Sequence, residues 1–337
     1  MVLLLLFSYR DRQVIYCCYK RYSTKGSRVT RGPFLFKFTN MKLAVIGLGL
    51  IGGSMAIDLR KAGFATEIMG VDINPDNAQE AYRLGIIDRI ETLESAVPMA
   101  DMVLIAIPVD KVLDSLIRVL DLVSDQTTVI DVGSTKKVIG SAVDNHPKRR
   151  NYISAHPMSG TENSGPSAAL EGLFEGKINI ICDQEKCGPQ HLAFAEKMFQ
   201  VLGMDIAYMT ADDQDHSTAF ISHLPHAAAF ALANAVLDKE DRTIIFDLAS
   251  GGFNSTVRLA KSSPEMWGPI FQQNREYVVE SLEVYIKHLK AFKKSIESDP
   301  QQMMALMKNA NRIRGILDGE NDSLVKNEKT IVKLYTK

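Results

Sequence analysis

The sequence predicts an α/β domain followed by an all-helical domain. Short apolar runs alternate with amphipathic stretches from residue 42 to about residue 208, and long helical patterns take over after about residue 210. The length of 337 residues also suits two domains, at roughly 100–200 residues each. With 46% hydrophobic and 23% charged residues the chain can form ordinary cores, which excludes disorder throughout its length.

Residues 1–40 differ in charge from the rest of the chain. They carry eight Lys/Arg and one Asp, about +7, whereas the remainder carries 31 basic and 39 acidic side chains, −8. They show no helical or strand period, and their apolar run Val2–Phe7 is far shorter than the roughly 20 residues of a membrane span. We expect a disordered or non-native extension, either a basic targeting segment or, as we favour, residues upstream of a true start at Met41. The overall charge of −1 argues against nucleic-acid binding.

The first predicted domain spans residues 41–209. Seven apolar runs in it are expected strands: Leu43–Ile46, Ile68–Val71, Met102–Ile107, Thr128–Val132, Tyr152–Ala155, Ile178–Ile181 and Ile206–Met209. Five segments between them are expected helices: Ile51–Ala62, Asp76–Leu84, Lys111–Val123, Lys136–Val143 and Pro189–Leu202. Because this alternation is typical of βαβ units, we expect a parallel sheet that is buried on both faces.

The second predicted domain spans residues 210–319 and is followed by a tail at residues 320–337. Its helical patterns cover Asp213–Leu237, Asp241–Ala249 and residues 266 to about 296. A last helix is expected to begin at Asp299-Pro300, a pair typical of an N-cap followed by proline at the first helical position.

A dinucleotide-binding fingerprint, G-x-G-x-x-G, lies between the first strand and the first helix. Gly47 allows the tight turn, Gly49 lets a pyrophosphate approach the backbone, and Gly52 lets helix and strand pack closely. Free N–H groups at the start of the helix, at Leu50 and Ile51, are expected to bind phosphate. A glycine-rich turn without a ligand and a flavin site are the alternatives, but strand, turn and helix together favour a nicotinamide dinucleotide.

The expected cofactor is NAD rather than NADP. Asp72 ends the second strand, 20 residues after Gly52, at the position where a carboxylate bonds the adenosine ribose. A carboxylate repels the extra phosphate of NADP, and the following Asn74-Pro75 offers no arginine to hold it.

Polar segments follow three of the predicted strands, where ligands bind in open α/β sheets. The first is residues 106–108, whose Ile107 and Pro108 are expected cofactor contacts. The others are residues 131–136 and residues 155–162.

His156 follows a predicted strand directly and is the expected catalytic base. Oxidation of an alcohol by NAD⁺ needs a group that takes the hydroxyl proton, and a histidine suits this because its pKa lies near neutrality. Ser134, at the end of a neighbouring strand, could bond that imidazole or the reacting hydroxyl. The alternative for His156 is a buried histidine that caps a strand end.

Three histidines, His216, His223 and His226, lie in the first helical segment of the second domain. His216 and His223 are seven apart and therefore share a helix face. No metal is expected, because Pro225 disrupts the helix and the spacing matches no zinc signature. An interdomain interface and substrate contact both stay open for these histidines.

Arg258 lies seven residues after the first glycine of the pair Gly251-Gly252 and could hold a carboxylate in bidentate fashion. A surface arginine is the alternative. The single tryptophan, Trp267, is expected in the core. The four cysteines match neither a zinc site nor a disulfide scaffold, so we expect free thiols in a reducing compartment, the cytoplasm.

Residues 41 to about 319 resemble the prephenate dehydrogenase family of tyrosine biosynthesis. The resemblance rests on the order and spacing of five motifs: GLGLIGGS at 47–54, DVGSTK at 131–136, HPMSGTE at 156–162, SHLPH at 222–226 and GGF…R at 251–258. It implies a Rossmann-type N-terminal domain followed by an all-α C-terminal dimerisation domain, with the active site between them and NAD as cofactor. The short terminal segments imply a monofunctional form without a fused mutase or regulatory domain.

The resemblance also implies a role for each matched side chain. His156 accepts the proton of the ring hydroxyl of prephenate while hydride passes to NAD⁺, and loss of CO₂ gives 4-hydroxyphenylpyruvate. Ser134 bonds His156 and the substrate. Further pocket residues are implied to be His226, Arg258, Ser222 and Thr161, with the acid Glu162 nearby.

One position departs from the family pattern. Many relatives carry an acid three residues before the arginine, where this chain has Ser255. Arg258 therefore lacks a local carboxylate partner, which puts in doubt any interdomain ion pair implied for it.

Three other functions stay open. Arogenate dehydrogenase performs the same chemistry on the amino-acid analogue of prephenate. A β-hydroxyacid dehydrogenase shares the two-domain plan but would be expected to use a catalytic lysine in the helical domain, where this chain has SHLPH. A non-catalytic NAD-sensing protein would not need His156, Ser134 and Arg258 together.

Overall fold

The computed structural model describes residues 5–9, 12–16, 40–239 and 251–317. Within the basic head, strands β1 (Leu5–Tyr9) and β2 (Arg12–Tyr16) pair antiparallel, although the sequence there showed no strand period. The expected helix Asp241–Ala249 and the tail at residues 320–337 lie outside the described residues.

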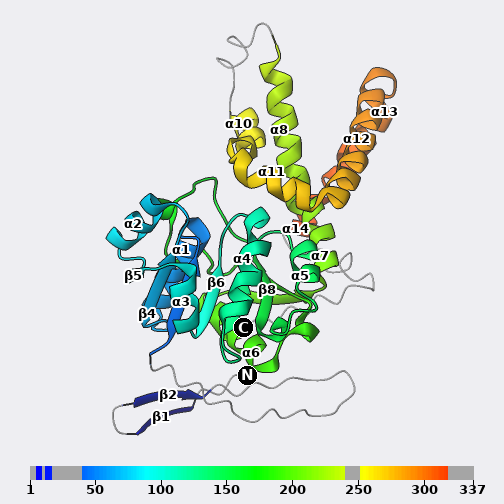
Figure 1. The fold of residues 1–337 in the computed structure, drawn as a ribbon. Helices are drawn as coiled ribbons and strands as arrows, with labels where there is room; N and C mark the ends of the chain where they lie inside the picture. Colours follow the sequence, from blue (N-terminus) through cyan, green and yellow to red (C-terminus); the bar gives the residue numbers. More distant parts are fainter. Residues whose placement is uncertain (1–4, 10–11, 17–39, 240–250, 318–337) are drawn as a thin grey trace, which may run out of the picture.

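An eight-stranded sheet forms the first part of the fold, and Figure 1 shows its place below the long helices. Its strands are β3 (Lys42–Ile46), β4 (Glu67–Val71), β5 (Arg89–Ile90), β6 (Met102–Ile105), β7 (Thr128–Asp131), β8 (Tyr152–Pro157), β9 (Ile178–Cys182) and β10 (Asp205–Met209). Their order in the sheet is β10-β9-β8-β7-β6-β3-β4-β5. All seven predicted strands are confirmed, with ends that differ by at most two residues; the short β5 is additional.

The expectation of a parallel sheet is wrong for one pair. Strands β8 and β9 run antiparallel, with His156 opposite Ile180, whereas the other neighbouring strands run parallel. A parallel pair needs a crossover that is usually an α-helix. Residues 158–177 instead contain only the short 3₁₀ helix η2 (Pro166–Ala168), and the chain turns back beside β8.

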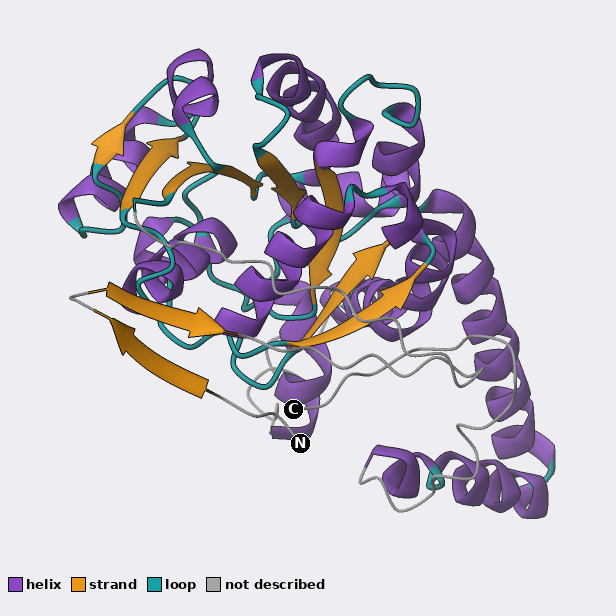
Figure 2. Ribbon diagram, turned by 90° about the horizontal axis from the view of Figure 1, so that it is seen from below, coloured by secondary structure: helices purple, strands orange, loops and turns teal. Residues whose placement is uncertain are grey.

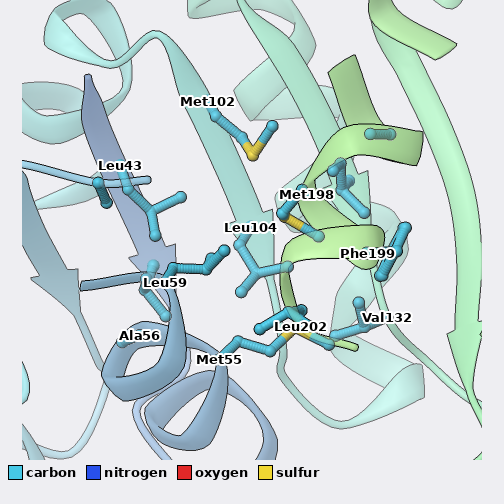
Figure 3. Close-up of a cluster of buried hydrophobic side chains, with 14 of the residues drawn as sticks. Leu43, Met55, Ala56, Leu59, Met102, Leu104, Val132, Met198, Phe199 and Leu202 are labelled. Atoms are coloured by element: carbon cyan, nitrogen blue, oxygen red, sulfur yellow. The ribbon is translucent and has the colours of Figure 1, made fainter. Parts of the chain in front are cut away.

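Helices cover both faces of the sheet (Figure 2). One face packs against α1 (Leu50–Lys61), α2 (Pro75–Arg83) and α6 (Pro189–Val201), and the other against α3 (Leu93–Met99), α4 (Val109–Leu122) and α5 (Lys137–Ala142). Side chains alternate between the two cores, since Leu43 and Val45 join the first and Ala44 the second. Figure 3 shows the first core, where Leu43 and Leu104 lie among side chains of α1 and α6.

The second part of the fold is helical. It comprises α7 (Ala211–Thr218), the π-helical η4 (Ala219–His223), α8 (Leu224–Leu237), α10 (Gly251–Val257), the 3₁₀ helix η5 (Arg258–Lys261), α11 (Pro264–Gln273), α12 (Arg275–Ser298), α13 (Pro300–Ala310) and α14 (Ile313–Leu317). Helices α8 and α12 extend away from the sheet (Figure 1). The side chain of Asp299 accepts the N–H of Gln302, which confirms the predicted N-cap.

Two predicted helices are divided in the structure. The segment predicted from residue 213 to 237 changes to π-helix at η4, and the segment predicted from residue 266 breaks at Asn274 between α11 and α12. The helical stretch of residues 211–237 is long and apolar enough to span a membrane by length and composition alone. Most of the apolar stretch of this helical segment is not buried against the rest of the described chain.

The helical part is seated on the sheet domain close to the carboxyl ends of its strands. Trp267 and Ile270 of α11 pack on Val109, the first residue of α4. The side chain of Gln273 donates to the carbonyl of Val109 at 2.7 Å and accepts from the hydroxyl of Thr135 at 2.7 Å. These contacts fix α11 over the edge of the sheet where the predicted site residues lie.

Candidate active site

The glycine-rich turn after β3 has the shape that its sequence predicts. Gly47 has φ +92°, and an added Cβ would lie 2.4 Å from the carbonyl oxygen of Ala106. A Cβ on Gly52 would lie 2.0 Å from the carbonyl oxygen of Gly47. Gly49 occupies the N-cap of α1 and carries no side chain over the free N–H groups of that helix. The turn therefore leaves a cradle for an anion such as a pyrophosphate.

The other predicted cofactor residues surround this turn. Asp72 follows β4, and its carboxylate accepts the backbone N–H of Leu48 and that of Asn74, each at 2.9 Å. Ile107 and Pro108 follow β6, the other neighbour of β3. The predicted residues Leu50 and Ile51 open α1; the side chain of Leu50 is buried, and that of Ile51 is partly buried against the core.

His156 lies near the end of β8, beside the loop after β7 that carries Ser134. The two residues are linked through a third, Gln214 of α7. Its Nε2 donates to His156 Nδ1 at 2.7 Å and to the carbonyl oxygen of Ser134 at 3.1 Å. Within the described part of the chain, no hydrogen bond joins the side chains of Ser134 and His156 directly.

A buried charge network lies beneath His156. Lys136 Nζ donates to Asp131 Oδ1 at 2.6 Å and to the carbonyl of Ala155 at 2.8 Å, and the Tyr152 hydroxyl donates to Asp131 Oδ2 at 2.5 Å. Lys136 and Asp131 are fully buried, so neither charge is stabilised by water and each depends on the other. The network ties the ends of β7 and β8 together below the imidazole.

The histidines of the site are neutral because of where they lie. Burial lowers the pKa of His156 to about 3, with contributions from the charge of Lys136 and from His223. Burial also lowers the pKa of His223 to about 4 and lowers the pKa of His226. Neutral imidazoles can accept protons or hydrogen bonds, as a dehydrogenase base requires.

The π-helical η4 carries Ser222 and His223, and His226 follows in the first turn of α8. His226 Nδ1 donates to the carbonyl of Ser222 at 2.9 Å, which leaves Nε2 free of that bond. The ring of His226 stacks on Trp267, with 3.5 Å between centroids. Trp267 is buried as predicted, and it also fixes a predicted site residue.

The spacing of His216 and His223 predicted that they share a helix face, and in the structure both contact the segment where α11 meets α12. His216 packs edge-on against Tyr277 at the exposed rim, whereas His223 is buried beside Asn274. Among the described residues, no three His, Cys, Asp or Glu side chains are grouped as metal ligands would be. Cys182 and Cys187 are buried and free.

Arg258 begins η5, and its guanidinium forms a 3.8 Å ion pair with Glu162 of the loop after β8. An ion pair between the two parts of the fold is therefore present without an acid at position 255. The Ser255 hydroxyl instead donates to the carbonyl of Gly252 at 2.9 Å. Both partners of the ion pair are more than two-fifths exposed, so the guanidinium can turn toward a ligand. The charge of Arg258 also contributes to the lowered pKa of His226, which places the two residues close together.

The remaining predicted residue, Thr161, lies in the same loop as Glu162, and its hydroxyl oxygen accepts the N–H of Asn163 at 3.2 Å. The sequence did not single out Gln214 or the buried pair of Asp131 and Lys136. Asp131 and Lys136 both lie in the strand-end segment 131–136, so the sequence did indicate their region. Gln214 is 58 residues from His156, and no spacing pattern connects them.

Two family models match consecutive parts of the chain. The model of the prephenate dehydrogenase nucleotide-binding domain matches residues 55–208, and that of the prephenate dehydrogenase dimerization domain matches residues 210–309. The point between them coincides with the change from strand β10 to helix α7.

Curated relatives and solved structures cover most of the chain. It is 31% identical to prephenate dehydrogenase of Bacillus subtilis over 277 residues, which is 81% of this chain and 75% of the relative. It is 30% identical to cyclohexadienyl dehydrogenase of Zymomonas mobilis over 285 residues, 83% of this chain and 97% of the relative.

Two solved structures superimpose over a similar share. One is prephenate dehydrogenase from A. aeolicus in complex with hydroxyphenyl propionate and NAD⁺, with a TM-score of 0.77, 31% identity, and coverage of 83% of this chain and 99% of that chain. The other is Synechocystis arogenate dehydrogenase, with a TM-score of 0.69, 28% identity, and coverage of 82% and 100%. By sequence and by fold, this chain belongs to the prephenate dehydrogenase family.

Proposed function

We propose that the chain is an NAD-dependent prephenate dehydrogenase that converts prephenate to 4-hydroxyphenylpyruvate. The observation that carries this proposal is a neutral His156 that Gln214 holds at the end of β8, in the same sheet whose β3 leads into the glycine-rich turn. Arg258 is paired with Glu162 of the loop that follows β8. A relative at 31% identity bears the name prephenate dehydrogenase.

The residues at the strand ends fit a dinucleotide. Gly47, Gly49 and Gly52 leave room for the pyrophosphate at the start of α1, and the Asp72 carboxylate beside them suits ribose hydroxyls. NAD⁺, when bound, accepts the hydride of the oxidised carbon. The acidic Asp72 supports NAD rather than NADP, as expected from the sequence.

His156 and Ser134 act on the hydroxyl that is oxidised. His156 accepts the hydroxyl proton at Nε2, the ring nitrogen that Gln214 does not bond, once the ring's own proton is on Nδ1. Ser134, partly buried beside the same strand end, bonds the reacting hydroxyl. Once hydride leaves, the ring carboxylate departs as CO₂, and the aromatic product forms.

Substrate binding falls to the residues of the helical part. Arg258 holds a substrate carboxylate by exchanging its long ion pair with Glu162 for a bidentate one. His226 presents Nε2 to the substrate side chain, while Ser222 and Thr161 complete the polar lining.

Arogenate is the second candidate substrate, since Synechocystis arogenate dehydrogenase superimposes on most of this chain. Arogenate bears an ammonium group, and the cationic Arg258 repels that group. A carboxylate side chain would attract the ammonium group, but the neutral His226 does not. We therefore favour prephenate. Steady-state kinetics with each substrate, and with NAD⁺ and NADP⁺, test this: kcat/KM is expected to be highest for prephenate with NAD⁺. A higher kcat/KM for arogenate would reassign the substrate.

The functional unit is a homodimer formed through the helical part. The matched second model is a dimerization domain, and α8 and α12 carry exposed apolar side chains at Leu232, Ile286, Leu289 and Ile296. We expect the enzyme to work in the cytoplasm and to bind neither nucleic acid nor a membrane. Its near-neutral charge and its free buried thiols Cys182 and Cys187 support this expectation.

A further inference from the structure

Among the described residues, Gln214 is the one side chain that bonds the Nδ1 atom of His156. It lies in the first turn of α7, where the chain leaves the sheet domain, and it is fully buried. Its Nε2 makes two hydrogen bonds, whereas its Oε1 has no hydrogen-bond partner within the described part of the chain. In a buried amide both the nitrogen and the oxygen usually form hydrogen bonds, so the unpaired Oε1 of Gln214 is unusual.

The carbonyl of Ser134 fixes which way the amide faces. A carbonyl oxygen only accepts hydrogen bonds, so the atom 3.1 Å from it is the amide nitrogen and not the amide oxygen. One N–H of that nitrogen points to Ser134, and the other points to His156. The amide therefore presents a donor to Nδ1, and Nδ1 must accept it with a lone pair. The single proton of the neutral imidazole then resides on Nε2.

We propose that Gln214 is a positioning residue that sets the protonation state of His156, holding the imidazole neutral with its proton on Nε2 until the amide turns over. The tautomer of the free protein does not depend on the proposed function, whereas the turning of the amide rests on the proposed role of His156 as base. An imidazole that accepts a substrate proton at Nε2 must carry its own proton on Nδ1. Half a turn of the Gln214 amide breaks the two hydrogen bonds of its nitrogen and places Oε1, which has no bond to give up, opposite Nδ1. The imidazole then releases its proton from Nε2 to solvent and takes one up from solvent at Nδ1, where Oε1 accepts it.

The charged and titratable groups around His156 favour the neutral ring but do not select its tautomer. Lys136 lies beyond the end of β7, His223 lies in η4, and Asp215 follows Gln214 on α7. Lys136 is paired with Asp131, and the carboxylate of Asp215 accepts the backbone N–H groups of residues 136 and 137. Of the described groups, only the Gln214 amide bonds a ring nitrogen of His156.

Nitrogen-15 NMR of the histidine side chains in the free, full-length protein tests the proposal without any substrate. The His156 signals are assigned as those absent from His156→Asn. We expect Nε2 to be protonated and Nδ1 to be bare in the parent protein. A parent protein with the proton on Nδ1 overturns the proposal, whether or not the protein turns over prephenate.

Substitutions at Gln214 supply the second readout. Gln214→Glu offers only acceptors, so it is expected to move the ring proton to Nδ1 and to raise the pKa of His156 by about 1–3 pH units. The acid limb of kcat/KM on prephenate should move in the same direction. Gln214→Met removes both donor and acceptor, and kcat is expected to fall about tenfold. An unchanged tautomer in Gln214→Glu overturns the proposal.

Gln273→Met is the matched control. Gln273 is also an amide at the junction of the two parts of the fold, but it bonds Thr135 and Val109 rather than His156. Its loss should leave the His156 tautomer as it is in the parent. A tautomer change in this control as large as that in Gln214→Glu would show a general loosening of the junction, and the proposal would be wrong.

Discussion

The pKa of His156 is lowered by burial and by the nearby charge of Lys136, so the ring is neutral over the whole physiological range. A neutral ring suits a base, but its low pKa also has a consequence for stability. The unfolded chain takes up protons at each histidine near pH 6.5, whereas the folded protein does not take up a proton at His156 until near pH 3. The neutral, buried His156 therefore costs no stability above pH 6.5, and the free energy of unfolding falls as the pH drops from 6.5 toward 3.

His156→Asn should therefore reduce the acid sensitivity of the fold. Between pH 7 and pH 5 the parent protein is expected to lose about 2 kcal/mol more of its free energy of unfolding than the variant. Asp215, whose pKa burial raises to about 6, acts in the opposite direction in both proteins and so does not affect the difference. Urea unfolding at the two pH values measures it, and equal losses would contradict the buried, neutral state of His156.

Arg258→Ala should raise KM for prephenate far more than it lowers kcat. The guanidinium is exposed and only loosely paired with Glu162, so its removal costs the fold little. It does remove a charge-assisted bond to a substrate carboxylate, and an increase in KM of roughly 10- to 100-fold follows from about 1.5–3 kcal/mol for such a bond. Ser255→Ala is the control on the same segment. An unchanged KM in Arg258→Ala would remove the arginine from the pocket.

Single residues show where prediction from the sequence ends. His156, Ser134 and Arg258 were singled out from the sequence because they stand in motifs with a fixed order along the chain. Gln214 could not, because its link to His156 exists only once α7 lies against the ends of β7 and β8. The ion pair of Arg258 with Glu162 was put in doubt by Ser255, yet a carboxylate from another element provides it.

At the scale of elements, the glycine-rich turn joins β3 to α1 and gives the sharpest test of the cofactor site. Gly47→Ala should lose NAD binding and destabilise the protein by about 1–3 kcal/mol, since the residue has φ +92° and no room for a Cβ. Gly63→Ala is the control, because Gly63 also has a positive φ, +66°, but has nothing within 4 Å of the added Cβ. Titration calorimetry with NAD⁺ and denaturant unfolding compare the two. Full NAD binding by Gly47→Ala would contradict the assignment of this turn.

The strands were predicted closely because most are buried on both faces and appear in the sequence as continuous apolar runs. The direction of each strand in the sheet was harder to predict from the sequence. A run of apolar residues does not show whether the chain crosses the sheet or turns back, and β9 turns back beside β8. The sequence also did not show the helix break at Asn274. The buried side chain of Asn274 bonds His223 and the carbonyl of Asp215, and these contacts exist only in the folded chain.

At the scale of the molecule, the exposed apolar face of α12 predicts that the chain does not act alone. Ile286→Lys is expected to shift the protein from dimer to monomer at low concentration, because it buries a charge in the interface. Analytical ultracentrifugation measures the change in mass. Ile117→Lys, at a similarly exposed apolar position on α4, should leave the mass unchanged. A parent protein that is monomeric at high concentration would contradict the proposed dimer.

The proposed activity joins two differently built parts of one chain, because Gln214 of the helical part bonds His156 of the sheet at the site proposed to oxidise prephenate. The most direct test follows NADH formation from prephenate by the parent protein and by His156→Asn, alongside NAD⁺ affinity. The parent is expected to form NADH and release CO₂ in equal amounts. The variant should keep its NAD⁺ affinity while kcat falls by roughly 10²–10⁴, the usual contribution of proton transfer by a positioned base. Normal turnover by His156→Asn, or no NADH from the parent, would contradict the claim.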